Sequence, residues 1–346
     1  MLPIAALRRR LLHWYDQNAR ALPWRIGPAD HARGARQDPY RVWLSEVMLQ
    51  QTTVPHATPY FLDFTLRWPT VTDLAAAPDA DVMAAWAGLG YYARARNLLA
   101  CARAVAGRHG GVFPDTEEGL LALPGVGAYT AAAVAAIAFD RATNVVDGNV
   151  ERVMARLYAV EAPLPGAKAE LKAHAARLVA DGRPGDWAQA LMDLGATICR
   201  PKQPSCDRCP IAEACAARAT GAPETYPRKE AKAERPRRRG VAYVLTQGGA
   251  VGLVRRPDKG LLGGMLALPT SDWGAKPAAL AGAPARAAWR SVGSIEHVFT
   301  HFALTLEVMR AEGEADDLIW TPVDEAARAL PSVFLKALRQ GLNGLL

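Results

Sequence analysis

The sequence predicts a two-domain protein, with an all-α domain over residues 1–219 and an α+β domain over residues 241–346. Its 346 residues are enough to bury two separate cores. In the first range apolar residues recur at a spacing of three to four, which is typical of helices. In the last range the segments VAYVLTQGGAVGLVRR and HVFTHFALTLEVMR show the alternation and glycine turns of strands.

Residues 220–240 separate the two domains and are predicted to form an exposed linker. They combine Pro, Gly and dense charge with almost no apolar side chains, so they cannot bury a core. Between Arg228 and Arg239 there are seven basic and two acidic residues. Such a tether can simply be solvated, or it can contact phosphates or bind a partner, and both remain open. The net charge of +7 and the pI near 9.3 favour a polyanionic partner.

No stretch approaches the ~20 continuous apolar residues that a membrane span needs. Near the N-terminus, Arg8, Arg9 and Arg10 interrupt the apolar residues. We therefore expect neither a membrane protein nor a secreted one. A cytoplasmic location, which is reducing, also suits cysteines reserved for a metal.

Four closely spaced cysteines end the first domain, in the loop over 199–215. Their spacing is C-x6-C-x2-C-x5-C, and prolines in the loop can hold the thiolates rigidly around a metal centre. Zinc sites made of four thiolates usually contain two CxxC pairs, and this loop has one, which favours an iron-sulfur cluster over zinc and over disulfides. Cys101 lies in a helix-like stretch and is expected to be a buried apolar side chain. The four expected ligands are Cys199, Cys206, Cys209 and Cys215.

A Leu-Pro-Gly-Val-Gly motif at 123–127 joins two predicted helices. Asp115 can cap the first, with Glu118 three residues on, and the second covers residues 128–139. Gly125 and Gly127 permit a tight turn whose backbone N–H groups can approach an anion at the start of the second helix. The motif therefore predicts a phosphate-binding hairpin, and the alternative is an ordinary corner between helices.

Glu46 has the surroundings of an acid catalyst if residues 40–51 form a helix. Its carboxyl then emerges from an apolar stripe that contains Val42, Trp43 and Leu49, where desolvation favours the protonated form. A carboxylic acid that is protonated near neutral pH can donate its proton to a ligand. A glutamate that extends to the helix surface is equally compatible with the pattern.

The hairpin, the Val146-Asp147-Gly148-Asn149 segment and the cysteine loop together resemble the endonuclease III superfamily of DNA glycosylases, over most of residues 7–215. Within it, the run LSEVMLQQT at 44–52 is similar to the signature of the MutY branch, the adenine glycosylases. Tyr129 stands where the bifunctional members carry a lysine. Because a phenol cannot form a Schiff base with the sugar, we expect a monofunctional enzyme.

The resemblance implies that Glu46 protonates the leaving adenine and that Asp147 stabilises or captures the positive sugar, as in glycosidases. Asn149 is expected to cap the helix over 150–160 and to leave Asp147 free for chemistry. The alternative is that Asp147 only caps that helix. Further residues implied at the site are Tyr129 and Asn149 beside the catalytic pair, and Trp24 and Arg25 at the border of the adenine pocket.

An enzyme that reaches a glycosidic bond inside duplex DNA must turn the nucleotide out of the stack. The resemblance places Gln51 in the vacated space and Tyr91 beside the orphaned base, whereas a core aromatic is the alternative for Tyr91. The residues expected to grip the DNA backbone are Gly125, Val126 and Gly127. The stretch 26–37 is longer than usual for the family, so the resemblance does not set its path.

The C-terminal domain resembles a MutT-like (Nudix-like) domain, because Gly260 to Pro269 (GLLGGMLALP) is similar to the segment that opens a Nudix motif. The Arg-Glu-x2-Glu-Glu run that would hold magnesium is missing, so we expect no nucleotide hydrolysis. Phe299, Thr300 and His301 resemble the family loop that touches 8-oxoguanine, with Thr300 in place of serine. The same residues are also compatible with a plain alternating strand.

The prediction is a monomeric, monofunctional glycosylase that removes adenine opposite 8-oxoguanine in double-stranded DNA and carries a [4Fe–4S] cluster. A glycosylase and lyase for oxidised pyrimidines would need a lysine at position 129 and no C-terminal domain. A cluster protein that binds DNA without chemistry is the second alternative, and the presence of both Glu46 and Asp147 argues against it.

Overall fold

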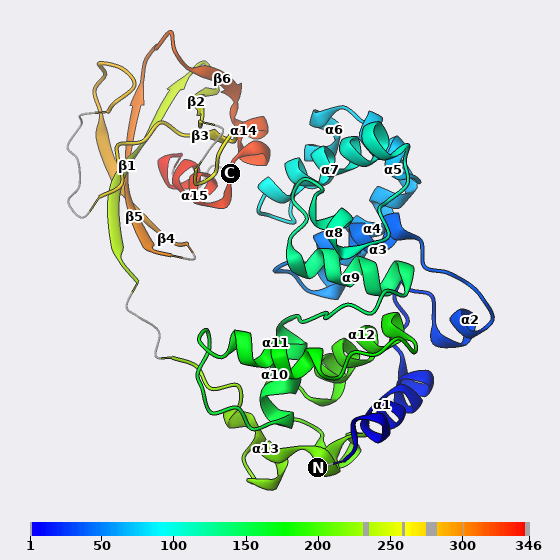
Figure 1. The fold of residues 1–346 in the computed structure, drawn as a ribbon. Coiled ribbons are helices and arrows are strands. Elements are labelled where there is room, and N and C mark those ends of the chain that lie inside the picture. Colours follow the sequence, from blue (N-terminus) through cyan, green and yellow to red (C-terminus); the bar gives the residue numbers. More distant parts are fainter. Residues whose placement is uncertain (1, 231–234, 258–259, 275–281, 300, 343–346) are drawn as a thin grey trace. The chain divides into compact units, whose positions relative to one another are not determined.

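The computed structural model describes residues 2–230, 235–257, 260–274, 282–299 and 301–342. The chain divides into two compact units, Met1–Ala231 and Lys232–Leu346. Figure 1 shows that the first unit is built of helices and that the second is a sheet accompanied by helices. The predicted fold class, an all-α part followed by an α+β part, is therefore confirmed.

The first unit contains thirteen α-helices among its described residues. They are α1 (Ile4–Asn18), α2 (Pro28–Ala32), α3 (Pro39–Met48), α4 (Val54–Arg67), α5 (Val71–Ala76), α6 (Asp79–Ala85), α7 (Ala93–His109), α8 (Glu117–Leu121), α9 (Ala128–Phe139), α10 (Gly148–Leu157), α11 (Lys168–Ala176), α12 (Pro184–Asp193) and α13 (Ala216–Ala219). A π-helical turn, Leu194–Ile198, follows α12, and short 3-10 turns occur at Cys206–Arg208, Ala212–Ala214 and Pro223–Thr225.

Helix α9 is buried on every side from residue 130 to residue 138, because its alanines leave no polar face. It packs against α3, α8 and α12. The contact with α12 is close, since a Cβ added to Gly185 would lie 2.7 Å from the carbonyl oxygen of Ala136. This central helix therefore fixes α3 and α12 relative to each other, and the candidate site lies beside it.

The start of α8 differs from the sequence prediction. Thr116, not Asp115, caps α8, and its hydroxyl accepts a hydrogen bond from the N–H of Gly119 at 3.2 Å. Asp115 instead pairs with Arg141. Thr116 is the better placed cap because its backbone is extended and its side chain reaches the third helical N–H group.

The segment predicted to be a linker is partly paired with the first unit. Tyr226 is buried, and its hydroxyl donates to Glu161. The N–H of Leu164 donates to the carbonyl of Arg228 at 2.8 Å, which ties the chain to the helical unit just before the boundary between the units. Residues 231–234, in the middle of the predicted linker, lie outside the described residues.

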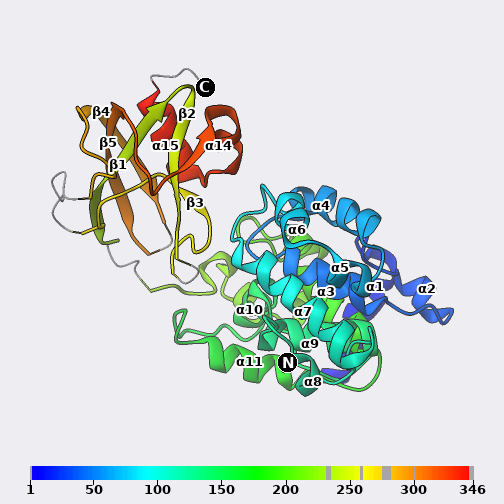
Figure 2. The ribbon, with the colours of Figure 1, turned by 90° about the horizontal axis from the view of Figure 1, so that it is seen from above.

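The second unit is a mixed six-stranded sheet with strand order β3-β2-β1-β5-β4, in which β6 also pairs with β2. Strands β1 and β5 run parallel, and the other pairs are antiparallel. Helix α15 packs against β1, β4 and β5 (Figure 2). The elements are β1 (Arg237–Gln247), β2 (Ala250–Arg255), β3 (Leu266–Ala267), β4 (Arg290–Val298), β5 (Ala303–Glu312), β6 (Ile319–Pro322), α14 (Val323–Ala329) and α15 (Ser332–Gly341).

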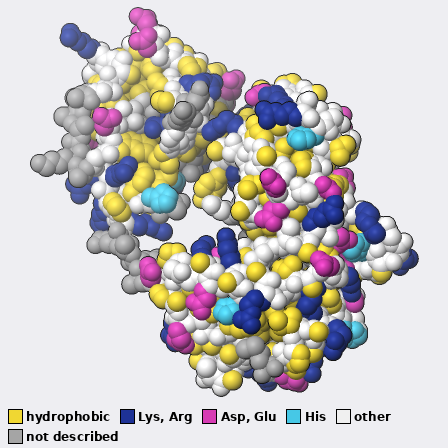
Figure 3. All heavy atoms as spheres, viewed as in Figure 1, with side chains coloured by type: hydrophobic (Ala, Val, Ile, Leu, Met, Phe, Trp, Pro, Cys, Tyr) yellow, Lys and Arg dark blue, Asp and Glu magenta, His cyan; other side chains and the backbone are white. Residues whose placement is uncertain are grey.

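Among the described residues, no helix has both the length and the apolar content for a membrane crossing. On the face drawn in Figure 3, the Lys and Arg side chains of the first unit are interspersed with acidic and apolar side chains. The positive net charge is therefore a weak guide to where a polyanion binds on this face.

Candidate active site

Glu46 lies on α3, whose first residues contain two strong helix-start signals. Asp38 caps the helix by accepting a hydrogen bond from the N–H of Tyr40 at 2.9 Å, and Pro39 occupies the first helical position. Glu46 is 9% exposed, so the alternative of a glutamate that extends to the helix surface is wrong. The hydroxyl of Tyr129, from the first turn of α9, donates to Glu46 Oε2 at 2.8 Å.

The pKa of Glu46 is raised to about 7, mainly by burial and also by the negative charge of Asp147. The hydrogen bond from Tyr129 and the positive charge of Arg25 act in the opposite direction. Burial, followed by the charges of Glu46 and Asp147, also holds the pKa of Tyr129 well above its ordinary value, so its hydroxyl remains a donor. Near neutral pH the Glu46 carboxyl can thus carry a proton and give it to a ligand.

Asp147 lies at the N-terminus of α10. Its Oδ1 accepts a hydrogen bond from the N–H of Val150 at 2.7 Å, and its Oδ2 accepts one from Asn149 Nδ2 at 2.8 Å. The prediction that Asn149 caps this helix is therefore wrong, because Asp147 itself is the cap. The two roles are compatible, since the helix N-terminus stabilises a negative charge and the two donors orient the carboxylate.

Asn149 links Asp147 to the cysteine loop through a residue that the sequence argument missed, Arg152. Asn149 Oδ1 accepts a hydrogen bond from Arg152 at 2.9 Å, and the same guanidinium donates to the carbonyls of Gly195 and Cys199, each at 2.7 Å. The only sequence signal for Arg152 is its position one helical turn after Asn149. These hydrogen bonds connect Asp147, through Asn149 and Arg152, to the start of the cysteine loop.

Trp24 and Arg25 border a small cavity that Glu46 also lines. The cavity has a volume of about 20 Å³ and is also lined by Gln189 and Met192 of α12. Pockets that hold small molecules have volumes of ~300 Å³ or more, so a molecule of that size can enter this cavity only when the lining side chains move. Neither Gln189 nor Met192 was predicted, because nothing local in the sequence of α12 marks them.

Arg25 is fixed by a buried carboxylate that the sequence argument also missed. Its guanidinium binds Asp193 through two hydrogen bonds of 2.6 and 3.2 Å. Arg20 also donates to this carboxylate, at 2.6 Å. Since Asp193 is fully buried, the two arginines supply the partners that a buried charge requires. The ion pair holds the segment with Trp24 and Arg25 against α12.

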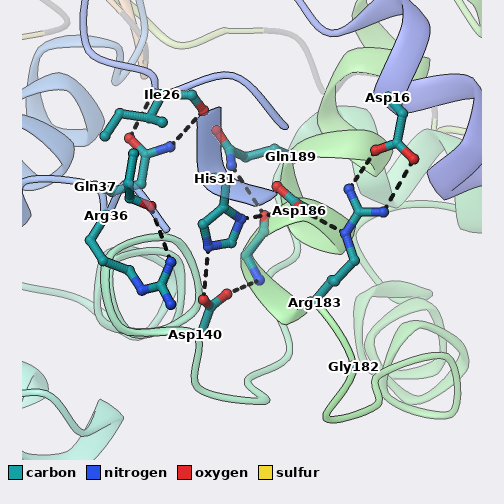
Figure 4. Close-up of polar contacts among 12 residues, drawn as sticks. Asp16, Ile26, His31, Arg36, Gln37, Asp140, Gly182, Arg183, Asp186 and Gln189 are labelled. Atoms are coloured by element: carbon teal, nitrogen blue, oxygen red, sulfur yellow. Dashed lines mark hydrogen bonds and ion pairs between the residues drawn. The ribbon is translucent and has the colours of Figure 1, made fainter. Parts of the chain in front are cut away.

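The stretch 26–37, whose path the sequence left open, folds back on the first unit (Figure 4). The side-chain amide of Gln37 makes two hydrogen bonds with the backbone of Ile26: it accepts from the N–H and donates to the carbonyl, both at 2.9 Å. His31 lies between Asp140 and Asp186, with ring nitrogens 3.0 and 3.3 Å from their carboxylate oxygens. The stretch therefore docks on the end of α9 and the start of α12.

The residues predicted to enter DNA lie on exposed turns. Gln51 and Tyr91 both have positive φ, 57° and 49°. Tyr91 is 57% exposed, so the alternative of a core aromatic is wrong. The helix predicted to reach Gln51 ends at Met48, because the chain leaves the helical conformation before Gln51.

The hairpin at 123–127 has the predicted form. Gly125 has φ of 70°, and a Cβ there would lie 2.5 Å from Cβ of Asn97, so the position needs glycine for conformation and for space. Gly127 caps α9 with an extended backbone and open space around it, so its glycine is not required by φ. The first N–H groups of α9 have no intrahelical partners and are available to an anion.

The four cysteines of the loop lie within electrostatic reach of one another. Burial raises the pKa of Cys209 to about 12, and the other three thiols contribute in the same direction. Arg156, which is 2% exposed, donates to Cys199 Sγ at 3.3 Å and to the carbonyls of Arg200 and Pro201 at 2.7 and 3.0 Å. A buried cation at the loop fits a set of thiolates. Cys101 is buried in α7, as predicted.

Within the described part of the chain, no group of three or more His, Cys, Asp or Glu side chains has the geometry to hold one metal ion.

In the second unit, Phe299 packs with Trp273, His297 and Phe302, at ring distances of 4.6–6.0 Å. His301 is exposed, and Thr300 lies outside the described residues. The alternative of a continuous strand is wrong, because β4 ends at Val298, β5 begins at Ala303, and the N–H of Phe299 donates to the carbonyl of Phe302 at 2.9 Å. Phe299 and His301 thus lie between two paired antiparallel strands.

Comparisons with known proteins agree with this architecture. The pattern of the HhH-GPD superfamily of base excision DNA repair proteins matches residues 44–179, and that of the NUDIX domain matches residues 240–340. A solved thermostable thymine-DNA glycosylase is similar with a TM-score of 0.55 and 29% identity, over 63% of this chain and 97% of that one. Endonuclease III in a non-covalent DNA complex has a TM-score of 0.51 and 21% identity, over 64% of this chain and 99% of that one, which supports the fold alone.

Relatives named adenine DNA glycosylase cover most of the chain. The human protein is 39% identical over 88% of this chain and 66% of its own length, and the mouse protein is 37% identical over 88% and 70%. The protein from Mycolicibacterium smegmatis is 41% identical over 62% of this chain and 70% of its own length. This chain therefore spans about two thirds of the length of these relatives. These likenesses confirm the resemblance inferred from the motifs, and the chain belongs to the adenine DNA glycosylase family of base excision repair proteins.

Proposed function

We propose that this chain hydrolyses the N-glycosidic bond of adenine that is mispaired with 8-oxoguanine in duplex DNA. The observation that carries the proposal is the pairing of Glu46 with Asp147 beside Tyr129. One carboxyl is buried and able to hold a proton, and the other is held at a helix N-terminus within electrostatic reach of the first. A protonated acid and an anion on opposite sides of a glycosidic bond are what its hydrolysis requires.

In the proposed reaction, Glu46 donates its proton to a ring nitrogen of the flipped adenine. The bond between C1′ and N9 breaks, and its electron pair leaves with the base. Positive charge then develops on the deoxyribose, where Asp147 stabilises it or captures C1′ covalently. Water adds to C1′ and gives up a proton, which restores the acid and leaves an abasic site.

Tyr129 and Asn149 are proposed to position these two carboxyls. Tyr129 holds Glu46 through its hydroxyl, and Asn149 holds Asp147 through its amide. There is no lysine between residues 123 and 139 to form a Schiff base with the sugar. We therefore propose a monofunctional enzyme in which strand scission is not part of the reaction.

The excision rate is expected to depend on pH with a descending limb. Only protonated Glu46 can donate, so single-turnover excision should fall as pH rises through about 7. Tyr129→Phe removes the hydrogen bond that lowers the pKa of Glu46, so the limb should move to higher pH. The check is a pH profile of both proteins on one mispaired duplex. A descending limb that stays in place in Tyr129→Phe would contradict this arrangement.

DNA binding is proposed to involve the hairpin at 123–127, whose N–H groups would contact phosphates without reading sequence. Gln51 would fill the space that the flipped adenine leaves, and Tyr91 would stack beside the orphaned base. Their exposure on turns supports this assignment.

We propose that Cys199, Cys206, Cys209 and Cys215 hold a [4Fe–4S] cluster, which would order their loop. The purified protein is then expected to contain four irons with acid-labile sulfide, and Cys206→Ser should lose both together with DNA affinity. Metal analysis and duplex binding measure this. Cys101→Ala is the matched control, because Cys101 lies in α7 and should leave the iron content unchanged. Stoichiometric zinc without iron would overturn the assignment.

The second unit is proposed to recognise the lesion through Phe299, Thr300 and His301, and the basic segment 220–240 is a candidate contact for repair proteins. The exposure of His301 and the aromatic packing of Phe299 support a turn that presents side chains to a base. We further propose that the enzyme acts as a monomer in the cytoplasm.

The deciding experiment is release of adenine from a duplex with one adenine opposite 8-oxoguanine. The proposal expects adenine release with intact strands, and much slower release from a matched A·T duplex. Binding without release would instead support a DNA-binding module. Cleavage at an oxidised pyrimidine with strand scission would support a lyase.

A further inference from the structure

One arginine outside the catalytic pair contacts both turns that are predicted to enter DNA. Arg94 lies in the first turn of α7. Its Nη1 donates to three carbonyls at the end of α3, and its Nη2 donates to two carbonyls of the turn before Tyr91. These acceptors are the carbonyl oxygens of Val47 at 3.0 Å, Met48 at 3.3 Å, Gln50 at 2.7 Å, Leu89 at 2.9 Å and Gly90 at 3.3 Å.

The contacts with α3 cap the C-terminus of the helix that carries Glu46. The last carbonyls of a helix have no intrahelical donors, and a cation there also meets the negative end of the macrodipole. Arg94 supplies this cation from another helix. In α7 itself, a positive charge in the first turn faces the positive end of the macrodipole. The stability of α7 therefore does not explain an arginine at this position.

The contacts with the second turn act on Tyr91 directly. The guanidinium carbon of Arg94 lies 5.6 Å from the centre of the Tyr91 ring and 5.3 Å from that of Trp86. Trp86 Nε1 also donates to the carbonyl of Gly90, at 3.0 Å. A half-buried arginine that contacts two aromatic rings and two carbonyls of this turn thus restricts both its backbone and the ring of Tyr91.

Both turns contain a residue whose conformation needs such support. Gln51 and Tyr91 have φ of 57° and 49°, a left-handed conformation that non-glycine residues adopt at a cost. Strain of this kind persists only where the surroundings fix it, and it is common where side chains are presented to a ligand. Arg94 is bonded to the carbonyl of the residue immediately before each of them, Gln50 and Gly90.

We propose that Arg94 is a positioning residue that holds Gln51 and Tyr91 in a preformed arrangement for entry into the DNA stack. The proposal rests on the proposed glycosylase function for the roles of Gln51 and Tyr91. A single planar guanidinium is suited to this task because its donors point in several fixed directions. With both turns set before DNA arrives, less ordering accompanies base flipping.

The test compares Arg94→Met and Arg94→Lys with Arg103→Met. Arg103 is a matched control, since it lies on the same helix and also donates to backbone carbonyls, those of Ala75 and Ala77, away from both turns. The first readout is amide hydrogen exchange in the free protein. We expect faster exchange in residues 49–53 and 87–92 of both Arg94 variants, and unchanged exchange there in Arg103→Met.

The second readout is single-turnover excision of adenine opposite 8-oxoguanine. Because misplacement by ~1 Å can lower a rate by about 10²-fold, Arg94→Met should be slower by about 10- to 100-fold, and Arg103→Met should stay within about twofold. Arg94→Met should lower the excision rate by a smaller factor in a Tyr91→Ala background than in the parent protein, because Arg94 acts partly by positioning Tyr91.

The proposal would be overturned if amide exchange in both turns were unchanged in the Arg94 variants. It would also be overturned if the rate reductions caused by Arg94→Met and by Tyr91→Ala multiplied fully in the double variant. If Arg94→Met unfolds the protein globally, fast amide exchange will extend to the buried α9. The comparison is then made with the milder variant Arg94→Lys. Failure of the proposed function is distinct, because the parent protein would then release no adenine while the exchange of its turns still reports on Arg94.

Discussion

Exchanging Glu46 for glutamine is expected to slow single-turnover release of adenine by about 10²- to 10⁴-fold, the range that a general acid contributes. Glutamine keeps the size of the side chain and can still contact Tyr129, but it has no proton to transfer. The pH profile should also lose its descending limb. Duplex binding should be retained, since Glu46 is buried and is not proposed to contact phosphates.

The matched control for this variant is Glu170→Gln on α11, an exposed glutamate 3.7 Å from His174. It should excise adenine at the rate of the parent. An active Glu46→Gln enzyme with an unchanged pH profile would mean that the proton comes from another group, and the assignment of Glu46 as the acid would then be wrong.

Exchanging Asp147 for asparagine is expected to slow excision by about 10²- to 10³-fold or more, because an electrostatic partner of the developing charge is lost. Asparagine caps helices about as well as aspartate, so α10 should still begin at the same place. The folded protein should therefore bind the mispaired duplex and fail to cleave the glycosidic bond. Rapid-quench kinetics and a binding titration on the same preparation separate these two effects.

Asp115→Asn makes the same chemical change at an exposed carboxylate that pairs with Arg141, and it should leave the rate unaltered. If Asp147→Asn lowers binding and excision by the same factor, Asp147 acts as a helix cap and a structural residue, and the two-carboxylate mechanism is contradicted.

Much of the fold follows from local sequence signals. The alanine run of α9 gives the helix its predicted bounds, 128–139, because small apolar residues satisfy both helix propensity and burial. Gly125 marks the hairpin, since only glycine fits its positive φ and its approach to Asn97. The helical first unit and the α+β character of the second were predictable from the spacing of apolar residues.

Local signals do not decide between neighbouring candidates for one role. Asp147 and Asn149 are both good caps, and the choice depends on contacts outside the segment. With Asp147 as cap, its carboxylate reaches the N–H of Val150, and the side chain of Asn149 is free to bind Arg152. That guanidinium is fixed in turn by the carbonyl of Cys199, which is 47 residues away in sequence.

The rest of the site depends on such long-range contacts. Tyr129 and Glu46 are 83 residues apart, and Arg25 and Asp193 are 168 residues apart. Periodicity within a helix shows which face is apolar, but it does not show which other helix covers that face. For this reason Gln189 and Arg94 carry no signal in the sequence and emerge only when α12, α3 and α7 are packed.

The central claim is that Glu46 and Asp147 flank an extruded adenine nucleoside. It is tested most directly by a crystal structure of this protein bound to a duplex in which a non-cleavable adenine nucleotide lies opposite 8-oxoguanine. The account predicts an adenine outside the stack, with a ring nitrogen at about 2.6–3.2 Å from the Glu46 carboxyl and with C1′ facing Asp147. An adenine that remains stacked, or that is flipped into a site where neither carboxyl contacts the nucleoside, would contradict it.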